Sequence, residues 1–268
     1  MRFAALTHVG NRGGENEDAV GWSEPDRLWL VADGMGGHAA GQVASGIVKE
    51  VLLRDSHEND LVAVVRRAHE AVLAAARSRE EWRGMGSTLV AARIGEGVCE
   101  VIWVGDSRAY LLRRGKLTPL TRDHSVVEEL RAEGVLSEAE IRSDPRANQI
   151  TRGLGQDSAA PSLNQVPLRR GDRILLCSDG LHDEVSDSAI ARLARSKAGP
   201  NAAAEALLEA ALESGGRDNI SVIVVDYDGP TAPAAMRMGH ARRDLIPILI
   251  GVVAAVLVIL AFWWWVPR

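Results

Sequence analysis

Acidic side chains follow several apolar runs of the sequence, and this placement bears most directly on chemistry. Asp33 follows Leu-Trp-Leu-Val-Ala, Asp106 follows Val-Ile-Trp-Val-Gly, and Asp179 follows Ile-Leu-Leu-Cys-Ser. Asp218 stands two residues before Ile-Ser-Val-Ile-Val-Val. A single aspartate in such a position is ordinarily a turn or cap residue. Four that gather at one edge of a core repel one another and lose hydration, so we expect two or three divalent cations to compensate them.

The ligand types indicate hard cations. Carboxylate oxygens suit Mg²⁺ or Mn²⁺, which keep several waters, better than zinc. The glycines of Asp33-Gly34-Met35-Gly36-Gly37-His38 let the backbone turn sharply, so a main-chain carbonyl can approach a metal held by Asp33. Glu17 and Asp18 add two carboxylates before the next strand. Two hard ions that share a carboxylate activate a bridging hydroxide and clamp a tetrahedral oxyanion, which predicts phosphoester hydrolysis.

Other chemistries find no support in the sequence. It contains neither a phosphate-binding GxxxxGK[ST] loop nor a dinucleotide-binding GxGxxG motif, and a GxSxG serine elbow is also absent. The net charge of −5 argues against a nucleic-acid partner. Cys99 and Cys177 lack zinc-site spacing and do not form a disulfide framework, which favours a reducing compartment.

The elements that must position these carboxylates form an α+β pattern. With 46% hydrophobic and 25% charged residues, the chain has enough apolar side chains for a packed core. Many strands with few long crossovers favour antiparallel sheets between helix layers. The predicted strands are Phe3–Val9, Leu28–Ala32, Thr88–Ile94, Glu100–Val104, Ala109–Arg113, Arg173–Ser178 and Ile220–Val225. The predicted helices are Gly41–Leu53, Leu61–Ala76, Asp187–Ser196 and Ala202–Glu213, the last with Asn201 as its cap.

A long polar excursion between strands runs from Thr121 to Asn164. It holds a capping-box candidate at Ser137 and Glu140 and a helix breaker at Pro145. Two interpretations stay open for it, a lid or substrate-recognition segment and plain surface decoration. We expect Asp123, His124 and Ser125 to cap the following helix rather than to react, and Thr88 to pack behind the metal site.

The C-terminal region predicts a membrane anchor. Residues Leu245 to Val266 form a run of 22 without a charge, of which 20 are apolar. As a helix this run spans about 33 Å, enough to cross a bilayer core of roughly 30 Å. Trp263, Trp264 and Trp265 lie where an interfacial aromatic belt belongs. The sequence therefore predicts one C-terminal transmembrane helix over 245–266.

The flanks of this run predict the side on which the remaining chain lies. Arg237, Arg242 and Arg243 precede the run, whereas only Arg268 follows it. The excess of arginines before the run favours a cytoplasmic catalytic domain on a single-pass C-terminal anchor. Residues 1–10 have no apolar core of signal-peptide length. We expect a domain over 1–228, a flexible Gly/Pro-containing linker over 229–244 and the transmembrane helix over 245–266.

With these patterns in place, the sequence resembles the metal-dependent protein phosphatase family, also called protein phosphatase 2C, in its compact bacterial form. The similarity rests on motifs that appear in the family's order across roughly residues 3–226. They are Asn16-Glu17-Asp18, Asp33-Gly34-Met35-Gly36-Gly37-His38 with Gly41, Gly86-Ser87-Thr88, Gly105-Asp106-Ser107-Arg108, Thr121-Arg122-Asp123-His124-Ser125, Ile150-Thr151-Arg152, Ser178-Asp179-Gly180-Leu181 and Asp218-Asn219. Each motif alone is a weak signal, whereas their ordered combination is specific.

The resemblance implies an antiparallel β-sandwich flanked by helix pairs, with an α-β-β-α order of layers. It implies a binuclear Mg²⁺/Mn²⁺ centre that hydrolyses phosphoserine and phosphothreonine in proteins, and residues 121–164 match the family's mobile flap. The implied roles are as follows: Asp33 bridges both ions, Gly34 gives its carbonyl to one, Asp179 and Asp218 hold the other, Glu17 and Asp18 act through water, and Asp106 joins Asp179 at a third ion.

Two departures from the family pattern concern the phosphate and the leaving group. The family usually places a phosphate-binding arginine three residues before the Asn of Asn-Glu-Asp, where this chain has Gly13, and Arg12 lies one residue further out. Either a one-residue bulge returns Arg12 to the phosphate, which we favour, or the contact is missing and substrate binding is weaker. Met35 replaces the histidine of the eukaryotic branch, and we expect His38 to be structural.

The leading hypothesis is a membrane-tethered serine/threonine phosphatase that opposes a bacterial serine/threonine kinase. Its partners would be phosphorylated proteins, the cognate kinase and the membrane. The displaced arginine leaves room for an alternative, a catalytically weak pseudophosphatase that acts as a phosphoprotein-binding or regulatory module. Retention of every metal carboxylate argues against that alternative. A partner-switching regulatory phosphatase would predict a fused sensor domain, which the sequence lacks.

Overall fold

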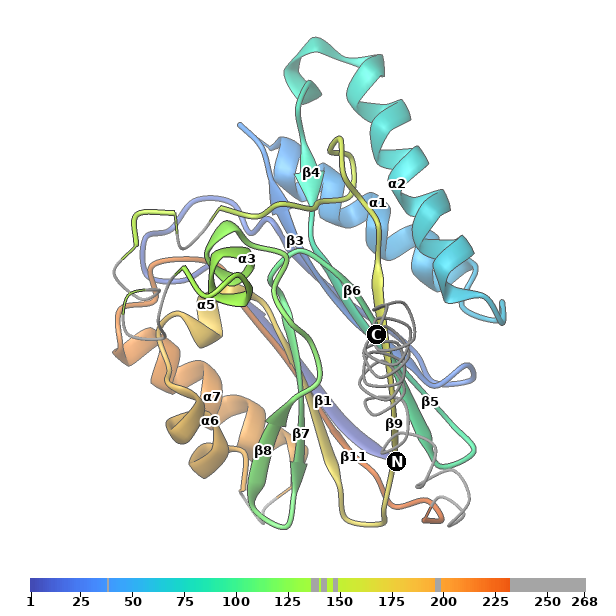
Figure 1. Ribbon diagram of the computed structural model, residues 1–268, viewed down its shortest axis with the longest axis vertical. Helices are drawn as coiled ribbons and strands as arrows, with labels where there is room; N and C mark the ends of the chain where they lie inside the picture. The colour runs from blue at the N-terminus through green and yellow to red at the C-terminus, as the bar shows by residue number, and fades with distance from the viewer. Residues whose placement is uncertain (38, 136–139, 141–143, 147–148, 196–198, 232–268) are drawn as a thin grey trace, which may run out of the picture.

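The computed structural model describes residues 1–231 apart from 38, 136–139, 141–143, 147–148 and 196–198, and Figure 1 shows two antiparallel sheets between layers of helices. One sheet has the order β1 (Arg2–His8), β11 (Ile220–Asp226), β10 (Arg173–Cys177), β7 (Arg108–Arg113) and β8 (Lys116–Pro119). The other has the order β2 (Asp18–Ser23), β3 (Leu28–Met35), β5 (Leu89–Gly95), β6 (Val98–Val104) and β9 (Ser162–Pro167), with β4 (Gly86–Ser87) paired to the end of β3.

The helices cover the outer faces of the two sheets. Helices α1 (Ala40–Arg54) and α2 (Leu61–Ser78) pack on the β3 sheet, and the short 3-10 helix η1 (Glu80–Trp82) follows α2. The sheet that contains β11 carries α5 (Asp179–His182), α6 (Asp187–Leu193) and α7 (Pro200–Glu213). Helix α3 (Val126–Ala132) lies in the polar excursion. The predicted α+β sandwich with antiparallel sheets is confirmed.

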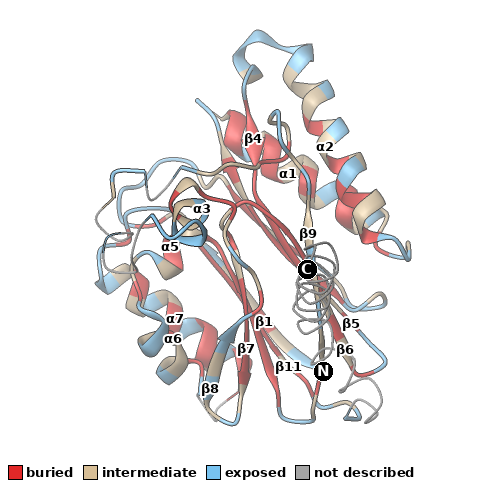
Figure 2. Ribbon diagram, viewed as in Figure 1, coloured by how far each residue is buried: buried red, intermediate tan, exposed pale blue. Residues whose placement is uncertain are grey.

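Side chains alternate between the two faces of each strand, and the apolar side chains therefore pack in three layers. On β3, Leu28, Leu30 and Ala32 face helices α1 and α2, while Trp29 and Val31 point into the sandwich interior. This is the two-residue period of a strand with both faces buried. Because both faces are covered, the central strands are continuously apolar in sequence, and they are the buried ribbons in Figure 2.

All seven predicted strands are present, and the strands that the sequence analysis missed have less apolar sequences. Strand β9 lies at a sheet edge, where its residues alternate between partly buried and exposed. Strand β8 is also an edge strand and is mostly exposed. Edge strands need only one apolar face or none, so the hydrophobic run that reveals a central strand is absent.

The predicted cap at Asn201 is wrong. Helix α7 begins at Pro200, and Gly199 is its N-cap residue with a φ of 107°. Proline at the first helical position has a preset φ and lacks only an N–H that would have no helical partner, so it fixes the start one residue before Asn201. Asp60 does cap α2, where its carboxylate accepts from the Ala63 N–H at 3.1 Å.

Three further predictions fall wholly or mostly outside the described residues. The transmembrane helix predicted over 245–266 lies there, as do residues 232–244 of the predicted linker and Ser137 of the predicted capping box. Among the helices that the structure describes, none has both the length and the apolar character needed to cross a bilayer.

Candidate metal centre

The strand register brings the predicted carboxylates to one end of the sandwich. Asp18 and Asp33 are directly opposite each other on β2 and β3. In the other sheet, Cys177 at the end of β10 pairs with Arg108 at the start of β7 and with Val222 near the start of β11. The residues just beyond these strand ends are Asp106, Asp179 and Asp218. All five aspartates therefore converge although they come from distant parts of the chain.

Asp18 is the most deeply buried of these carboxylates. Its side chain accepts the Ser178 hydroxyl at 2.7 Å through Oδ2, while Oδ1 is buried without a hydrogen-bond partner in the described chain. Loss of hydration, helped by the charges of Asp218 and Glu17, raises the pKa of Asp18 to about 6 against the opposing effect of hydrogen bonds from Ser221 and Ser178. A buried carboxylate with one unpaired oxygen is the kind of ligand that a cation or a water bound to it would satisfy.

Asp33 occupies the centre of the acidic cluster. Burial raises its pKa well above the ordinary value, and the charges of Asp179, Asp18 and Asp106 act in the same direction. Its backbone N–H donates to Thr88 Oγ1 at 3.0 Å, and that hydroxyl lies 2.7 Å from Ser107 Oγ. Thr88 is buried, so its predicted place behind the site agrees with the structure.

Asp106 and Asp179, both half-buried, complete the inner part of the cluster. Burial raises the pKa of each to about 7, and the charge of Asp179 also contributes to the shift of Asp106. Asp179 is the first residue of α5, and its Oδ1 is a second buried oxygen without a partner in the described chain. The position of Asp179 at the start of this short helix turns its carboxylate toward Asp33.

Glu17 and Asp218 form the solvent side of the cluster, and Asn219 holds them together. The Glu17 N–H donates to Asn219 Oδ1 at 2.7 Å, while Asn219 Nδ2 donates to the Val9 carbonyl at 3.1 Å. Asp218 is exposed, and its carboxylate accepts the Asn219 N–H at 2.7 Å. Burial raises the pKa of Glu17, with further contributions from Glu15 and Asp218.

Gly34 and Gly41 are required by close backbone packing beside these carboxylates. A Cβ at Gly34 would lie 2.0 Å from the Gly41 carbonyl oxygen, and one at Gly41 would lie 2.5 Å from the Glu17 carboxylate. The Gly34 N–H donates to the Glu17 carbonyl at 3.1 Å. These contacts hold the Gly34 backbone beside Glu17, and the approach of the Gly34 carbonyl to a metal stays a prediction.

The donor set fits hard divalent ions. Every candidate ligand is an oxygen, and two of the buried carboxylate oxygens lack hydrogen-bond partners. The raised pKa values of Asp18 and Asp179 favour their neutral forms at moderate pH only while no cation is near. Within the described residues, no group of three or more His, Cys, Asp or Glu side chains is arranged so that it could hold a metal ion by itself. Mg²⁺ and Mn²⁺ retain waters when bound, so an incomplete protein shell agrees with these ions.

Arg12 lies on a loop next to Asp218 and is exposed. Gly10 of this loop packs so closely that a Cβ there would lie 2.2 Å from the Asp218 carbonyl oxygen. Gly13 and Gly14 adopt φ values of 69° and 103°, so the loop turns immediately after the arginine. Arg12 makes no hydrogen bond or ion pair with the rest of the described chain, which leaves its guanidinium available to a ligand.

The start of the polar excursion is tied to the strand end that carries Asp106. Arg108 makes a bidentate ion pair with Asp123, at 2.9 Å and 2.6 Å. Ser125 caps α3 by accepting the Glu128 N–H, as predicted for this tripeptide. His124 stacks on Trp103, and burial together with Arg152 lowers the pKa of His124 to about 4. His38 lies outside the described residues.

Two supporting residues were in recognised motifs without an assigned role. Ser178 donates to Asp18, and Asn219 connects Glu17 to the segment that holds Asp218. In the sequence, Ser178 and Asn219 are distinguished only by being adjacent to the candidate ligands Asp179 and Asp218. Their partners are 160 and 202 residues away, so no local spacing indicates these contacts.

Comparison with known proteins agrees with this geometry. A family model described as protein phosphatase 2C matches residues 7–213. The serine/threonine protein phosphatase PstP of Mycobacterium tuberculosis is 41% identical over 246 residues, which cover 87% of this chain and 47% of that protein. The chain thus spans about half the length of that curated relative. The serine/threonine phosphatase stp of Listeria monocytogenes is 35% identical, with 82% of this chain and 91% of that protein covered.

Solved structures share the fold. The crystal structure of M. tuberculosis PstP superposes with a TM-score of 0.80 at 38% identity and covers 85% of this chain and 99% of that one. The PstP catalytic domain in complex with two manganese ions gives a TM-score of 0.78, also at 38% identity, with 85% and 98% covered. On the family model, the identity to these relatives and the shared fold, the chain belongs to the protein phosphatase 2C family.

Proposed function

We propose that this protein is a Mn²⁺- or Mg²⁺-dependent serine/threonine protein phosphatase that hydrolyses phosphoserine and phosphothreonine in protein substrates. The observation that carries the proposal is the convergence of Asp18, which is buried, with Asp33 and Asp179, which are half-buried, all three with pKa values raised by loss of hydration. Without a cation this arrangement is unfavourable to folding, because the charges are desolvated and repel one another. Its presence is explained by a function that needs bound cations.

The carboxylates divide into groups by position. Asp33, the Gly34 carbonyl, Asp179 and Asp218 would hold the two principal ions, and Asp106 with Asp179 would hold a third. Glu17 and Asp18 would act through bound water. When bound, such ions supply an activated water and neutralise the charge that develops on a phosphoryl group. The support for these roles is the shared strand end and the central place of Asp33.

The protein's own groups prepare the site. Ser178 donates to the Asp18 carboxylate, and the Thr88 hydroxyl accepts the backbone N–H of Asp33, so the Asp18 side chain and the Asp33 main chain are held in place before a ligand arrives. Arg12, exposed beside the Asp218 segment, would bind the phosphate of the substrate through its guanidinium. The open setting of Arg12 suits a phosphorylated side chain on a protein surface. A pseudophosphatase is disfavoured because all the candidate ligands are retained.

We further propose a location at the membrane. Residues 229–244 would form the linker and residues 245–266 the anchor, with the catalytic domain in the cytoplasm. The support is the uncharged run of 22 residues and the arginines that precede it. The proposed partners are phosphorylated proteins and a serine/threonine kinase that the enzyme opposes.

The test uses residues 1–231, because the Tyr227 hydroxyl donates to the Pro230 carbonyl and Thr231 ends the described chain. The crystallised PstP chain that corresponds to 85% of this protein shows that such a domain folds without a C-terminal tail. Mn²⁺-dependent release of phosphate from a phosphothreonine peptide is the expected result. A folded domain that binds the peptide but releases no phosphate would instead support the pseudophosphatase.

A further inference from the structure

The opposite end of the sandwich from the acidic cluster is rich in arginine. Two adjoining pockets, of about 440 Å³ and 330 Å³, lie there. Together they are lined by seven arginines and three aspartates. Strand β11 runs from Ile220, near the metal centre, to Asp226 in the larger pocket. A strand of seven residues is about 20 Å long, so the two ends of the molecule are well separated.

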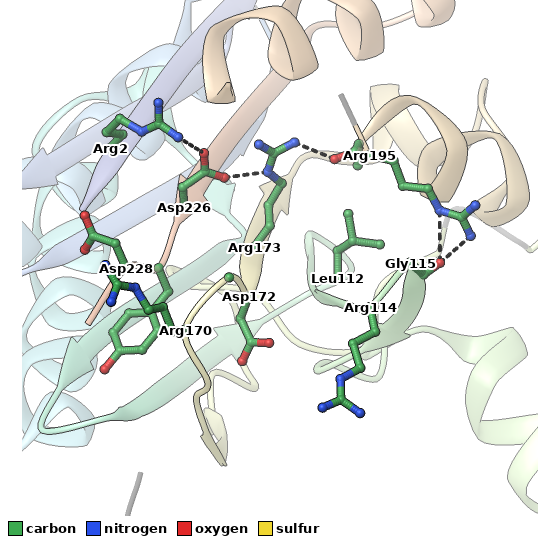
Figure 3. Close-up of a pocket in the computed structure, with 13 residues that line it drawn as sticks. Arg2, Leu112, Arg114, Gly115, Arg170, Asp172, Arg173, Arg195, Asp226 and Asp228 are labelled. Carbon is green, nitrogen blue, oxygen red and sulfur yellow. Dashed lines mark hydrogen bonds and ion pairs between the residues drawn. The ribbon is translucent and has the colours of Figure 1, made fainter. Parts of the chain in front are cut away.

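The aspartates of this face are already occupied. Asp172 pairs with Arg113 at 2.5 Å, and Asp226 pairs with both Arg173 and Arg2, at 2.6 Å and 3.3 Å. Figure 3 shows Arg2 and Arg173 on either side of the Asp226 carboxylate. The third aspartate of the two pockets, Asp228, pairs with the N-terminal amine at 3.1 Å. Each aspartate of the two pockets therefore already has an ionic partner, although the charge of Asp228 also attracts Arg170.

Four arginines of the two pockets form no ion pair in the described chain, namely Arg114, Arg169, Arg170 and Arg195, and of these Arg195 donates to the Gly115 carbonyl oxygen. Arg114 and Arg170 are exposed, and the buried Nε of Arg169 has no hydrogen-bond acceptor in the described chain. In Figure 3 the Arg114 guanidinium extends away from the network of dashed contacts. A cluster of cations with this much unused donor capacity is suited to an anionic partner.

The backbone conformation at Arg114 is unfavourable for an arginine. Arg114 and Gly115 form the two-residue turn between β7 and β8, with φ values of 51° and 81°. The first position of such a turn favours asparagine, aspartate or glycine, and a long side chain with positive φ is uncommon there. The structure holds an arginine where the backbone favours a shorter residue, which is a reason to look for a use of its charge.

The course of the chain indicates which anionic partner is in reach. The described chain ends at Thr231, which lines the smaller pocket beside Arg170. The remaining residues, 232–268, contain Arg237, Arg242 and Arg243 and then the uncharged run over 245–266. The exit to the proposed anchor therefore lies on the arginine-rich face, and the segment that follows adds cations of the same sign.

We propose that the arginine-rich face, centred on Arg114, Arg169 and Arg170, docks the domain on the anionic headgroups of a phospholipid bilayer. Surface arginines contribute attraction to such membranes, each in a screened and roughly additive way. Docking by this face points the acidic metal centre away from the bilayer. This orientation is favourable because the anionic headgroups would repel the acidic side chains. The centre would then face soluble phosphoproteins, so the proposal adds an orientation to the proposed tether.

The test measures binding of residues 1–231, loaded with Mn²⁺, to sedimented vesicles without the anchor. The vesicles contain phosphatidylcholine alone or with one-third phosphatidylglycerol. We expect binding to the anionic vesicles only, with loss at high salt. The double variant Arg114→Asn, Arg170→Gln should bind at least about tenfold more weakly. Arg114→Asn places a favoured residue in the turn, so a loss of binding cannot be explained by loss of fold.

The matched control is Arg66→Gln, Arg77→Gln, which removes two exposed cations from α2 and leaves the arginine-rich face intact. It should bind the anionic vesicles as the parent does. Equal weakening by both pairs would overturn the proposal, as would an absence of binding to anionic vesicles. Full displacement by millimolar inorganic phosphate at constant ionic strength would also contradict it, because it would identify a small-anion pocket. Hydrolysis of p-nitrophenyl phosphate, measured in parallel, separates this result from that of the proposed phosphatase activity.

Discussion

Asp18 and Asp33 lie directly opposite each other on the paired strands β2 and β3, in a position where like charges destabilise a sheet. Burial raises the pKa of both carboxyls, and the charge of Asp18 contributes to the shift of Asp33. The acidic centre is therefore unfavourable in the metal-free protein at neutral pH. Cations that bind between these carboxylates would convert this repulsion into affinity, which links metal binding to stability.

The stability of the metal-free domain should fall as the pH rises. Asp18 titrates at about 6 and Asp106 and Asp179 at about 7 in the folded protein, all above the ordinary 3.8. Groups with raised pKa values stabilise the fold fully below about pH 4, and this contribution is lost as pH rises through 6 and 7. Thermal unfolding in a chelator should show the decline, and Mn²⁺ should suppress it. The decline should be shallower in Asp179→Asn, and an equal slope in that variant would contradict the assignment.

Asp33 and Asp106 should differ in their importance for catalysis. Asp33→Asn should reduce turnover of p-nitrophenyl phosphate to the uncatalysed level, because the central carboxylate that is proposed to hold the principal ions loses its charge. Asp106→Asn should lower turnover while both principal ions stay bound. Steady-state rates over a range of Mn²⁺ concentrations distinguish the two effects. Full activity in Asp33→Asn would rule out its bridging role.

Arg12 should affect substrate binding more than the chemical step. Arg12→Ala removes a charge-assisted hydrogen bond to the phosphate, so we expect KM for a phosphothreonine peptide to rise about tenfold, roughly 1.4 kcal/mol. The kcat should change little. Arg77→Ala, on the exposed face of α2, controls for a general loss of positive charge. If Arg12→Ala had the same kcat and KM as the parent protein, the one-residue offset of Arg12 from the family position would have removed its contact with the phosphate.

The Arg108–Asp123 ion pair should contribute measurably to stability. The two side chains are 30% and 15% exposed and make a bidentate contact beside the strand end that leads from Asp106. Arg108→Ala leaves the Asp123 carboxylate unpaired, which should cost about 2 kcal/mol of unfolding free energy. The pair of Arg54 and Asp55 offers the comparison, because Arg54 is 58% exposed and Asp55 also pairs with Arg67 at 2.8 Å, so Arg54→Ala should leave the denaturant midpoint almost unchanged. If the two substitutions had equal effects, the pair would have no special role.

The part of the fold that the sequence predicts is the part with the strongest local signal. Strands β3 and β10 are buried on both faces, so their apolar runs identify them, and the aspartates that end these runs were recognised as candidate ligands. Strands β8 and β9 were missed because edge strands carry fewer apolar residues. The predicted cap of α7, Asn201, lies two residues after the observed cap, Gly199, because Pro200 fixes the helix start.

Contacts between distant segments mark the limit of such prediction. The hydrogen bond from Ser178 to Asp18 joins residues 160 positions apart, and its geometry depends on the pairing of both sheets. The same holds for the arginine-rich face, whose members come from turns at the far ends of β7, β9 and β10. In the sequence these arginines resemble an ordinary solvated surface, and only the fold shows that their carboxylate neighbours are already paired.

The most direct test of the metal centre is a calorimetric titration of Mn²⁺ into metal-free residues 1–231 and into the same domain with Asp33→Asn. The acidic cluster predicts at least two ions per chain for the parent domain and a lower stoichiometry for the variant, with chelator restoring the metal-free state. A parent domain that binds fewer than two ions, or a variant that binds as many as the parent, would contradict the account.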